Sequence, residues 1–325
     1  MRLQLAITGM LAALLPLPVS AADHVVFGLD YVPSGQHAPF YVAQGKGFFA
    51  ANGLDVDMQR GYGSSDTVKR VAAGAFEIGF GDTGAVILSR AEGLKVKTFA
   101  MIYVQAPYTL IVRDDAEIKT PKDLIGKTLA GPVGSATRTM FPLFARQAGI
   151  DPNSVNWLTT DAANLLPVLL ANRAAGVAEF YAGHATYLTK AEENGVKLHV
   201  IRYSDYGVDI YSNGLIARDQ TMAERPDVLR RFVKALHEAY EYTYAHPDAA
   251  AQILADAQPH LSPRLIQANI QAVKELNTPK RNDRPWGYID RDMMVATRQA
   301  AAEAYASENA KAVSVDECFT NDFVK

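Results

Sequence analysis

The chain has 325 residues and a formal net charge of −3, from 32 Lys and Arg against 35 Asp and Glu. This near balance excludes a large basic surface of the kind that binds nucleic acid or acidic lipid. The single cysteine, Cys318, excludes an internal disulfide and a CxxC metal or redox site, and its place beside Phe319 favours a small buried apolar residue.

The first 22 residues have the features of an export signal. Arg2 supplies a positive start, residues 3–17 are mostly apolar, and Ala21 and Ala22 lie at a possible cleavage site. The apolar part is too short to span a bilayer, and no later stretch reaches about 18 uninterrupted apolar residues. We therefore expect residues 1–22 to be a signal peptide and the mature protein to be periplasmic.

A mature chain of about 300 residues exceeds the size at which one core keeps growing, so we expect two lobes. In its first part, strand-like runs alternate with helix-like segments. The strands are predicted at residues 25–29, 54–58, 76–80 and 96–103, and the helices at 40–51, 65–73 and 83–92. Repeated β-α-β units with short joints predict a mainly parallel sheet flanked by helices.

The turn after the first strand carries Tyr31, Gln36 and His37, just beyond the strand's carboxyl end. Open α/β sheets bind small molecules at this edge. A Tyr and a His in a turn are more often surface residues. The prediction that Tyr31 and His37 contact a ligand therefore depends on other loops converging with them.

Asp82 and Thr83 directly follow the run FEIGF and are flanked by Gly81 and Gly84. Either residue can cap the next helix by accepting its free backbone N–H groups, which could instead meet a polar ligand atom. If one of the two caps the helix, the other is left to face the ligand. We expect Asp82 and Thr83 to belong to the ligand site.

The run at residues 105–113 is strand-like, and residues 109–112 within it are interpreted as a crossover into a second lobe. That lobe repeats the alternation, with strands predicted at 126–130, 156–158, 176–180 and 197–201 and helices at 135–147, 164–171 and 183–194. The run at 206–217 is the strand expected to cross back. Helices are then predicted from Pro226 to the break at Pro247, at 249–257, 263–276 and 290–306, one of them with an apolar face at helical spacing.

These elements predict an α/β fold of two Rossmann-like lobes with mainly parallel sheets, joined by two crossover strands. We expect lobe I to comprise residues 23–108 and 212–325, and lobe II residues 109–211. Closure would be a rotation about the two crossovers, near residues 108–112 and 207–211.

Lobe II offers its own candidate contacts. The turn GPVGSATR places Gly134 and Ser135 before a helix, where free N–H groups can receive a polar or anionic group. The GxxxxGK[ST] spacing of a P-loop is absent. Arg138 could pair with a carboxylate or sulfonate or be an exposed surface residue. From strand alternation we expect Phe180 in the core and Tyr181 toward the cleft.

Motifs of catalysis are missing from the sequence. There is no GxSxG, HExxH or GxGxxG, and the seven histidines have no repeating spacing. We therefore expect no enzyme, no catalytic residue, no metal site and no cofactor.

Four stretches together resemble a known family. They are DYVPSGQHAPFYVAQGKGFFAANGLDV, VAAGAFEIGFGD, IKTPKDLIGKTLAGPVGS and RPDVLRRFVKALHEAYEYTYAHPDAA. In this order, over nearly all of the mature chain, they are similar to the solute-binding proteins of ABC importers in the thiamine-pyrimidine, riboflavin and alkanesulfonate/taurine/nitrate group. The resemblance implies a type 2 periplasmic-binding fold and a monomeric receptor that delivers a small molecule to an ABC permease and its ATPase.

The opening around Asp30, Tyr31, Pro33 and His37 looks most like the branch that binds aminopyrimidines and flavin-like heterocycles. A fungal pyrimidine synthase also belongs to this branch. Its cofactor-binding lysine corresponds here to Gly81, and its cysteine-rich motif, expected near residues 213–217, has no cysteines. The resemblance therefore implies the fold and the binding role, without the synthase activity.

The prediction is a flat heterocycle held between the lobes, with an alkanesulfonate, taurine or nitrate receptor as the alternative. Stacking on Tyr31 and Tyr181 and hydrogen bonds to Asp82 or Thr83 would hold the ring, while a polar or anionic tail would lie on the Gly134–Ser135 turn. The full set of expected ligand contacts is Tyr31, His37, Asp82, Thr83, Tyr108, Gly134, Ser135, Arg138, Tyr181 and Tyr206.

Overall fold

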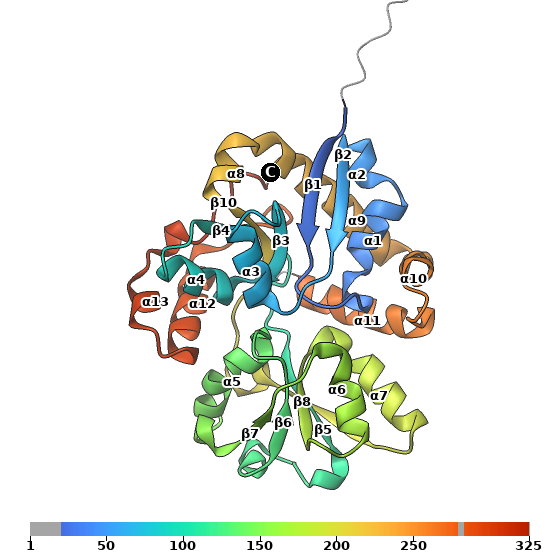
Figure 1. Cartoon of the computed structure of the whole chain (residues 1–325), viewed down its shortest axis with the longest axis vertical. Coiled ribbons are helices and arrows are strands. Elements are labelled where there is room, and N and C mark those ends of the chain that lie inside the picture. Colours follow the sequence, from blue (N-terminus) through green and yellow to red (C-terminus); the bar gives the residue numbers. More distant parts are fainter. Residues whose placement is uncertain (1–20, 279–282, 325) are drawn as a thin grey trace, which may run out of the picture.

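The structure is a computed structural model that describes residues 21–278 and 283–324. Almost all of the expected signal peptide, residues 1–20, lies outside the described residues. In the described part, two five-stranded sheets form two lobes, one above the other in Figure 1. The prediction of an α/β fold with two mainly parallel sheets is confirmed.

The first sheet has the strand order β2-β1-β3-β10-β4. Its strands are β1 (Asp23–Gly28), β2 (Leu54–Gln59), β3 (Ile78–Asp82), β4 (Val96–Met101) and β10 (Asn213–Arg218). Strand β1 pairs in parallel with β2 and β3, whereas β10 is antiparallel to both of its neighbours. We call this sheet and the helices packed on it lobe I.

Helices cover both faces of the first sheet (Figure 1). One layer contains α1 (Ala38–Gly45), α2 (Phe48–Ala51), α9 (Pro226–Ala245), α10 (Pro247–Ala257) and α11 (Pro263–Asn277). The other contains α3 (Ser64–Ala72), α4 (Thr83–Ala91), α12 (Arg291–Ala304) and α13 (Glu308–Ala312), and α8 (Asp219–Glu224) follows β10. In the core of this lobe, Phe27 packs edge to face against both Phe40 and Phe232.

The second sheet repeats this pattern with the order β7-β6-β8-β5-β9. Its strands are β5 (Tyr108–Arg113), β6 (Thr128–Ala130), β7 (Asn156–Leu158), β8 (Gly176–Phe180) and β9 (Leu198–Arg202). Here β5 is the antiparallel strand, between β8 and β9. The sheet and its helices α5 (Ala136–Gln147), α6 (Leu165–Leu170) and α7 (His184–Glu193) form lobe II.

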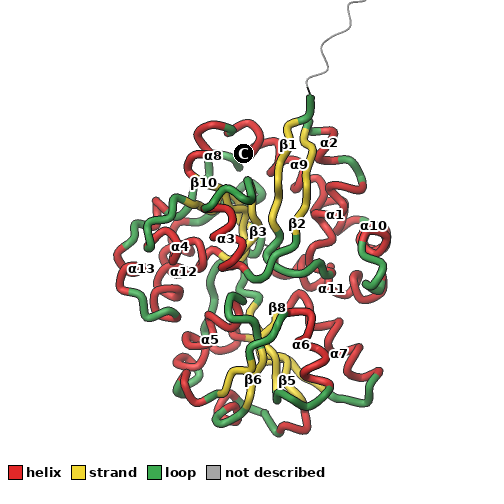
Figure 2. The backbone as a smooth tube through the Cα atoms, in the orientation of Figure 1, coloured by secondary structure: helices red, strands yellow, loops and turns green. Residues whose placement is uncertain are grey.

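Two irregular segments join the lobes, as Figure 2 shows by the loops between the upper and lower halves. Residues 102–107 lead from β4 into β5, and residues 207–212 lead from the end of lobe II into β10. The first crossover therefore lies before residues 108–112, the position predicted for it from the sequence, because those residues pair with β8 and β9 as part of β5. Each sheet thus receives its antiparallel strand directly after a crossover. This arrangement places the carboxyl ends of the parallel strands of both sheets at the interface between the lobes.

Two predicted elements differ most from the structure. The strand expected at 206–217 begins only at Asn213, as β10. The other difference is in the helix expected at 40–51. It is split into α1 and α2 because Gly47 adopts a left-handed backbone (φ 74°), which ends one helix before the next begins. The short helices α8 and α13 were not predicted. No helix among the described residues is both long and apolar enough to cross a membrane.

Candidate functional site

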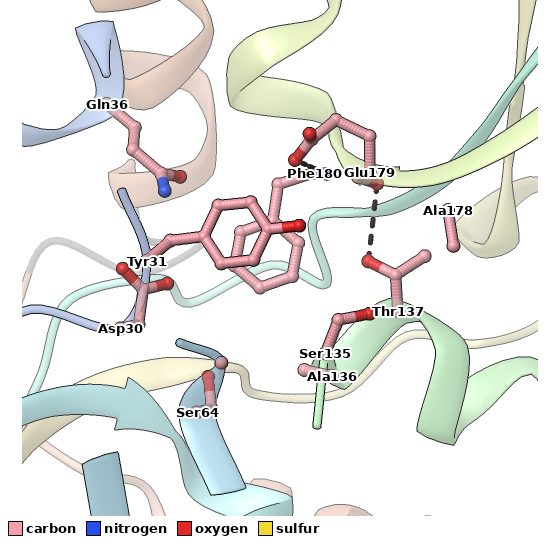
Figure 3. A pocket seen from close by; sticks show the side chains of 11 residues that line it. Asp30, Tyr31, Gln36, Ser64, Ser135, Ala136, Thr137, Ala178, Glu179 and Phe180 are labelled. Carbon is pink, nitrogen blue, oxygen red and sulfur yellow. Dashed lines mark hydrogen bonds between the residues drawn. The ribbon is translucent and has the colours of Figure 1, made fainter. Parts of the chain in front are cut away.

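A small cavity lies between the lobes at the ends of the central strands (Figure 3). Its volume is about 20 Å³, enough for about one water molecule. Its walls are Asp30, Tyr31, Gln36, Gly63, Ser64, Ser135, Ala136, Thr137, Ala178, Glu179 and Phe180. We call this space the inner cavity.

Tyr31 supplies the aromatic surface of the inner cavity. In Figure 3 its ring extends from the Asp30 side across the cavity toward Glu179 and Thr137. Burial, together with the nearby carboxylates of Glu179 and Asp30, raises the pKa of Tyr31 well above its ordinary value. The phenol therefore stays neutral and can both stack on a flat ligand and form a hydrogen bond.

Asp30 is held by two side chains from distant parts of the chain. Nε2 of His37 donates to one carboxylate oxygen at 2.8 Å, and Nδ2 of Asn213 donates to the other at 2.7 Å. The backbone N–H of Ser34 donates to Nδ1 of His37, so the imidazole donates through Nε2. His37 is fully buried and lies behind Asp30, orienting the carboxylate at the cavity wall.

Glu179 is the second carboxylate of the inner cavity and comes from lobe II. It accepts hydrogen bonds from the backbone N–H of Phe180 at 2.8 Å and the hydroxyl of Tyr187 at 2.8 Å. Burial raises the pKa of Glu179 to about 7, since these bonds offset only part of the desolvation and the Asp30 carboxylate adds to it. A ligand N–H or O–H group would stabilise its ionised form.

Two helices begin at the cavity wall. Helix α3 starts at Ser64 and helix α5 directly after Ser135, whose hydroxyl caps it by accepting the N–H of Arg138 at 3.2 Å. Both helices are at least eight residues long, so their N-termini carry partial positive charge at the cavity. The cavity can therefore bind hydrogen-bond acceptors of a ligand near Ser64 and Ser135. It can bind hydrogen-bond donors of a ligand near Asp30 and Glu179.

Asp82 and Tyr108 lie together at the crossovers, behind the inner cavity. One Asp82 oxygen accepts the hydroxyls of Tyr108 and of Ser212, the latter at 2.9 Å, and the other caps α4 by accepting the Ala85 N–H. Tyr108 opens β5 and Ser212 ends the return segment, so this one carboxylate touches both crossovers. Burial raises its pKa, against the effect of these hydrogen bonds.

Other predicted contacts lie outside the inner cavity. Thr83 is fully buried beside Thr98, with 3.3 Å between their hydroxyl oxygens. The Arg138 guanidinium donates to the Gly131 carbonyl at 2.7 Å and lies over Trp157.

The aromatic candidates of lobe II and the Gly134 turn have contacts of their own. The Tyr181 ring stacks on His184 at 4.3 Å, with the Arg202 guanidinium 4.1 Å away. The ring of Tyr206 packs against Phe144. The Gly134 carbonyl accepts the Ser65 N–H at 3.5 Å, a contact between the lobes.

Several cavity residues were not among the sequence candidates: Asp30, Gln36, Ser64, Thr137, Glu179 and Phe180. A signal for Glu179 was present, because it is a charged residue inside the otherwise apolar strand GVAEF. Gln36 lies in the first turn, where the sequence predicts ligand contacts for Tyr31 and His37 only. No cluster of His, Cys, Asp or Glu in the described ranges could hold a metal ion.

A wider groove continues outward from the inner cavity and shares Tyr31, Gln36 and Glu179 with it. It lies between α10–α11 of lobe I and α6–α7 of lobe II and has a volume of about 790 Å³. We call it the outer groove. Here Nδ2 of Asn269 donates across the lobes to the hydroxyl of Thr186 at 3.0 Å.

Comparisons with known proteins show which proteins this chain is similar to. The riboflavin-binding protein RibY of Chloroflexus aurantiacus is 25% identical over 96% of this chain and 89% of its own length. The formylaminopyrimidine-binding protein of Halalkalibacterium halodurans is 28% identical over 76% of this chain and 74% of its own.

Among solved structures, the alkanesulfonate-binding protein SsuA of Xanthomonas axonopodis superposes with a TM-score of 0.74 at 13% identity, covering 92% of this chain and 99% of that one. This likeness shows that the chain has the fold of a periplasmic binding protein. The family profile described as NMT1/THI5 like matches residues 34–250, about two thirds of the chain. The chain belongs to the NMT1/THI5-like family.

Proposed function

We propose that this protein is an extracytoplasmic receptor that captures a small solute between its lobes and delivers it to an ABC permease and its ATPase. The two-lobed fold, the cavity at the lobe interface and the binding-protein names of its relatives support this function. The signal-like residues 1–22 support a periplasmic location. We further propose a monomer divided into residues 23–108 with 212–325 and residues 109–211, except that Tyr108 begins β5 and therefore belongs to lobe II.

The proposed cargo is a flat heterocycle with donor groups on its edge, such as an aminopyrimidine or a flavin-like ring. One observation carries this choice. The inner cavity is lined by the Tyr31 ring and by the carboxylates of Asp30 and Glu179, and no Lys or Arg is among the described residues that line it. A ring that stacks on Tyr31 and donates to carboxylates matches this surface.

Capture requires the lobes to separate first, since the inner cavity has room for about one water. Rotation about residues 102–107 and 207–212 would open it, with Asp82 holding the two segments together at Tyr108 and Ser212. We propose that Tyr31 and Ser135 contact the cargo, while His37 and Asp82 position other groups.

A second candidate is a zwitterionic sulfonate such as taurine. The N-termini of α3 and α5 at the cavity wall favour it, because they would receive a sulfonate while Asp30 or Glu179 received the ammonium. Nitrate or a simple aliphatic sulfonate fits less well, since either would bring only negative charge toward two carboxylates.

A pyrimidine-synthase activity is disfavoured. The position that corresponds to the synthase lysine is Gly81, which pairs with Gly214 inside the first sheet. A Cβ built on Gly81 would lie 3.2 Å from Ile216, so the site has little room for a longer side chain.

A thermal-shift panel of aminopyrimidines, riboflavin, taurine and aliphatic sulfonates tests the choice, because a bound cargo raises the melting temperature. We expect at least one heterocycle to raise it and the aliphatic sulfonates to leave it unchanged. A response to sulfonates alone would overturn the heterocycle assignment. Recovery of the bound compound unchanged after long incubation separates a receptor from an enzyme.

A further inference from the structure

Two amide side chains in the outer groove have a polar atom without a partner. Oε1 of Gln36 and Oδ1 of Asn269 are inaccessible to solvent and accept no hydrogen bond from any described residue. The two residues are 4% and 3% exposed, and both line the groove. Burying an unpaired amide oxygen costs about 1–3 kcal/mol, so such atoms in a ligand groove point to a missing partner.

The two amides belong to one patch, although 233 positions separate them. Gly35, next to Gln36, packs so closely on α11 that a Cβ built there would lie 2.6 Å from the Cβ of Asn269. The other end of the Asn269 amide is already engaged by Thr186 of lobe II. The two amides therefore lie in one patch at the point where the lobes meet.

The groove begins where the inner cavity ends. Tyr31, Gln36 and Glu179 line both spaces, so a molecule whose ring lies on Tyr31 can extend past Gln36 toward Asn269. The groove offers about 790 Å³, far more than the inner cavity. Space for a side arm thus adjoins the ring site directly.

Hydroxyl groups suit these amides best. A hydroxyl can donate to an amide oxygen and, if an amide turns about its last bond, can accept from its NH₂ group instead. A carboxylate or sulfonate could pair with Arg60 or Lys190 of the groove, but it can only accept and would leave both amide oxygens unpaired. An alkyl arm would leave both oxygens unpaired.

We infer that the outer groove is a second subsite, in which Gln36 and Asn269 bind a hydroxyl-bearing arm attached to the ring in the inner cavity. This inference rests on the proposed heterocycle function and narrows it to ring compounds with a polyhydroxyl chain. The amides then select the arm, while Tyr31 and Glu179 select the ring.

Riboflavin and lumiflavin test this assignment, because they share the isoalloxazine ring and only riboflavin carries the ribityl arm. Titration calorimetry of the full mature chain should show riboflavin binding at least about tenfold more tightly than lumiflavin. Gln36→Leu and Asn269→Leu should each weaken riboflavin roughly three- to tenfold more than they weaken lumiflavin. Some loss of lumiflavin binding is expected too, because Gln36 also lines the inner cavity and Asn269→Leu also removes the bond to Thr186. Retained lumiflavin binding also shows that a variant is folded.

Thr186→Val is the matched control. It removes the bond between the lobes from Asn269 but keeps the Asn269 oxygen, so it should weaken both flavins equally and preserve their ratio. Equal affinity of the wild type for the two flavins overturns the second subsite and leaves the proposed function standing. Binding of neither flavin also overturns the subsite, and failure of every heterocycle in the panel overturns the proposed function as well.

Discussion

Asp82 and Glu179 hold matching places in the two lobes, yet their surroundings differ. Each lies at the carboxyl end of the strand that stands third in its sheet, β3 in one and β8 in the other. Asp82 accepts hydrogen bonds from two hydroxyls and one backbone N–H and does not line the inner cavity. Glu179 accepts two bonds and faces that cavity.

The difference follows from where each carboxylate falls on its strand. Asp82 is the last residue of β3, opposite Asn213 of β10, whereas Glu179 is the last but one of β8, opposite Thr109 of β5. Successive side chains of a strand point to opposite faces, so a shift of one residue changes what a side chain meets. A carboxylate at the end of this strand can thus bind the crossover segments in one lobe and line the ligand cavity in the other.

The largest expected effect is on stability, and it should differ between the two carboxylates. Asp82→Ala leaves the buried hydroxyls of Tyr108 and Ser212 without their acceptor, so we expect the free energy of unfolding to fall by about 3 kcal/mol or more. Urea denaturation followed by circular dichroism measures this loss. The comparison variant, Glu179→Gln, should lose little stability, because it removes a carboxylate whose burial is only partly compensated.

Tyr108→Phe identifies the source of that loss. Combined with Asp82→Ala in a double-mutant cycle, it should show a coupling of about 1 kcal/mol or more between the two side chains. Additive effects would mean that Asp82 stabilises the protein without holding the crossover at Tyr108.

The next effect is on binding. Glu179→Gln replaces a charged acceptor with a neutral amide, and bonds to charged groups contribute about 1.5–3 kcal/mol, so the Kd of a donor-bearing heterocycle should rise roughly ten- to a hundredfold. Calorimetry with the best compound of the thermal-shift panel measures the change. Glu193→Gln, on the exposed end of α7, is the control and should bind like the wild type. An unchanged Kd for Glu179→Gln would remove this carboxylate from the ligand site.

The smallest effect is the pH dependence of the empty protein. Because the folded-state pKa of Glu179 is about 7, above its ordinary value of 4.5, the native state binds more protons than the unfolded state between these pH values. Stability contributed by this group therefore falls as pH rises from about 4.5 to about 7, and it is constant outside that window. We expect roughly 1 kcal/mol, since cavity water reduces the full linkage value.

The measurement is the free energy of unfolding of the wild type and of Glu179→Gln at pH 4.5 and pH 8. The difference between the two proteins isolates the contribution of Glu179, because the contributions of the other titrating groups cancel. Relative to Glu179→Gln, the wild type should have a lower free energy of unfolding at pH 8 than at pH 4.5. A difference that does not change with pH would mean that Glu179 titrates near its ordinary pKa in the folded protein.

Most of the fold could be predicted because the signals are local. Strands β7 and β8 begin and end where periodicity and turn residues place them, and the first antiparallel strand was expected at the crossover. Local signals are weaker for short helices, which explains why α8 and α13 were not predicted.

The site was harder to predict because its contacts join distant residues. Tyr31 and Ser135 follow strands and line the cavity, as loops at a sheet edge suggest. The bond from Asn213 to Asp30 spans 183 positions, and no spacing in the sequence indicates it. Alternation pointed Tyr181 toward the cleft, but β8 ends at Phe180 and Tyr181 already belongs to the following turn.

The late arrival of β10 constrains the order in which the protein can fold. This strand lies between β3 and β4, but residues 213–218 are made only after the whole of lobe II. Lobe II has all five of its described strands within one continuous stretch, whereas the earlier part of lobe I would have a gap in the middle of its sheet. We expect lobe II to acquire native structure first during synthesis or refolding, with lobe I completing its core when β10 inserts.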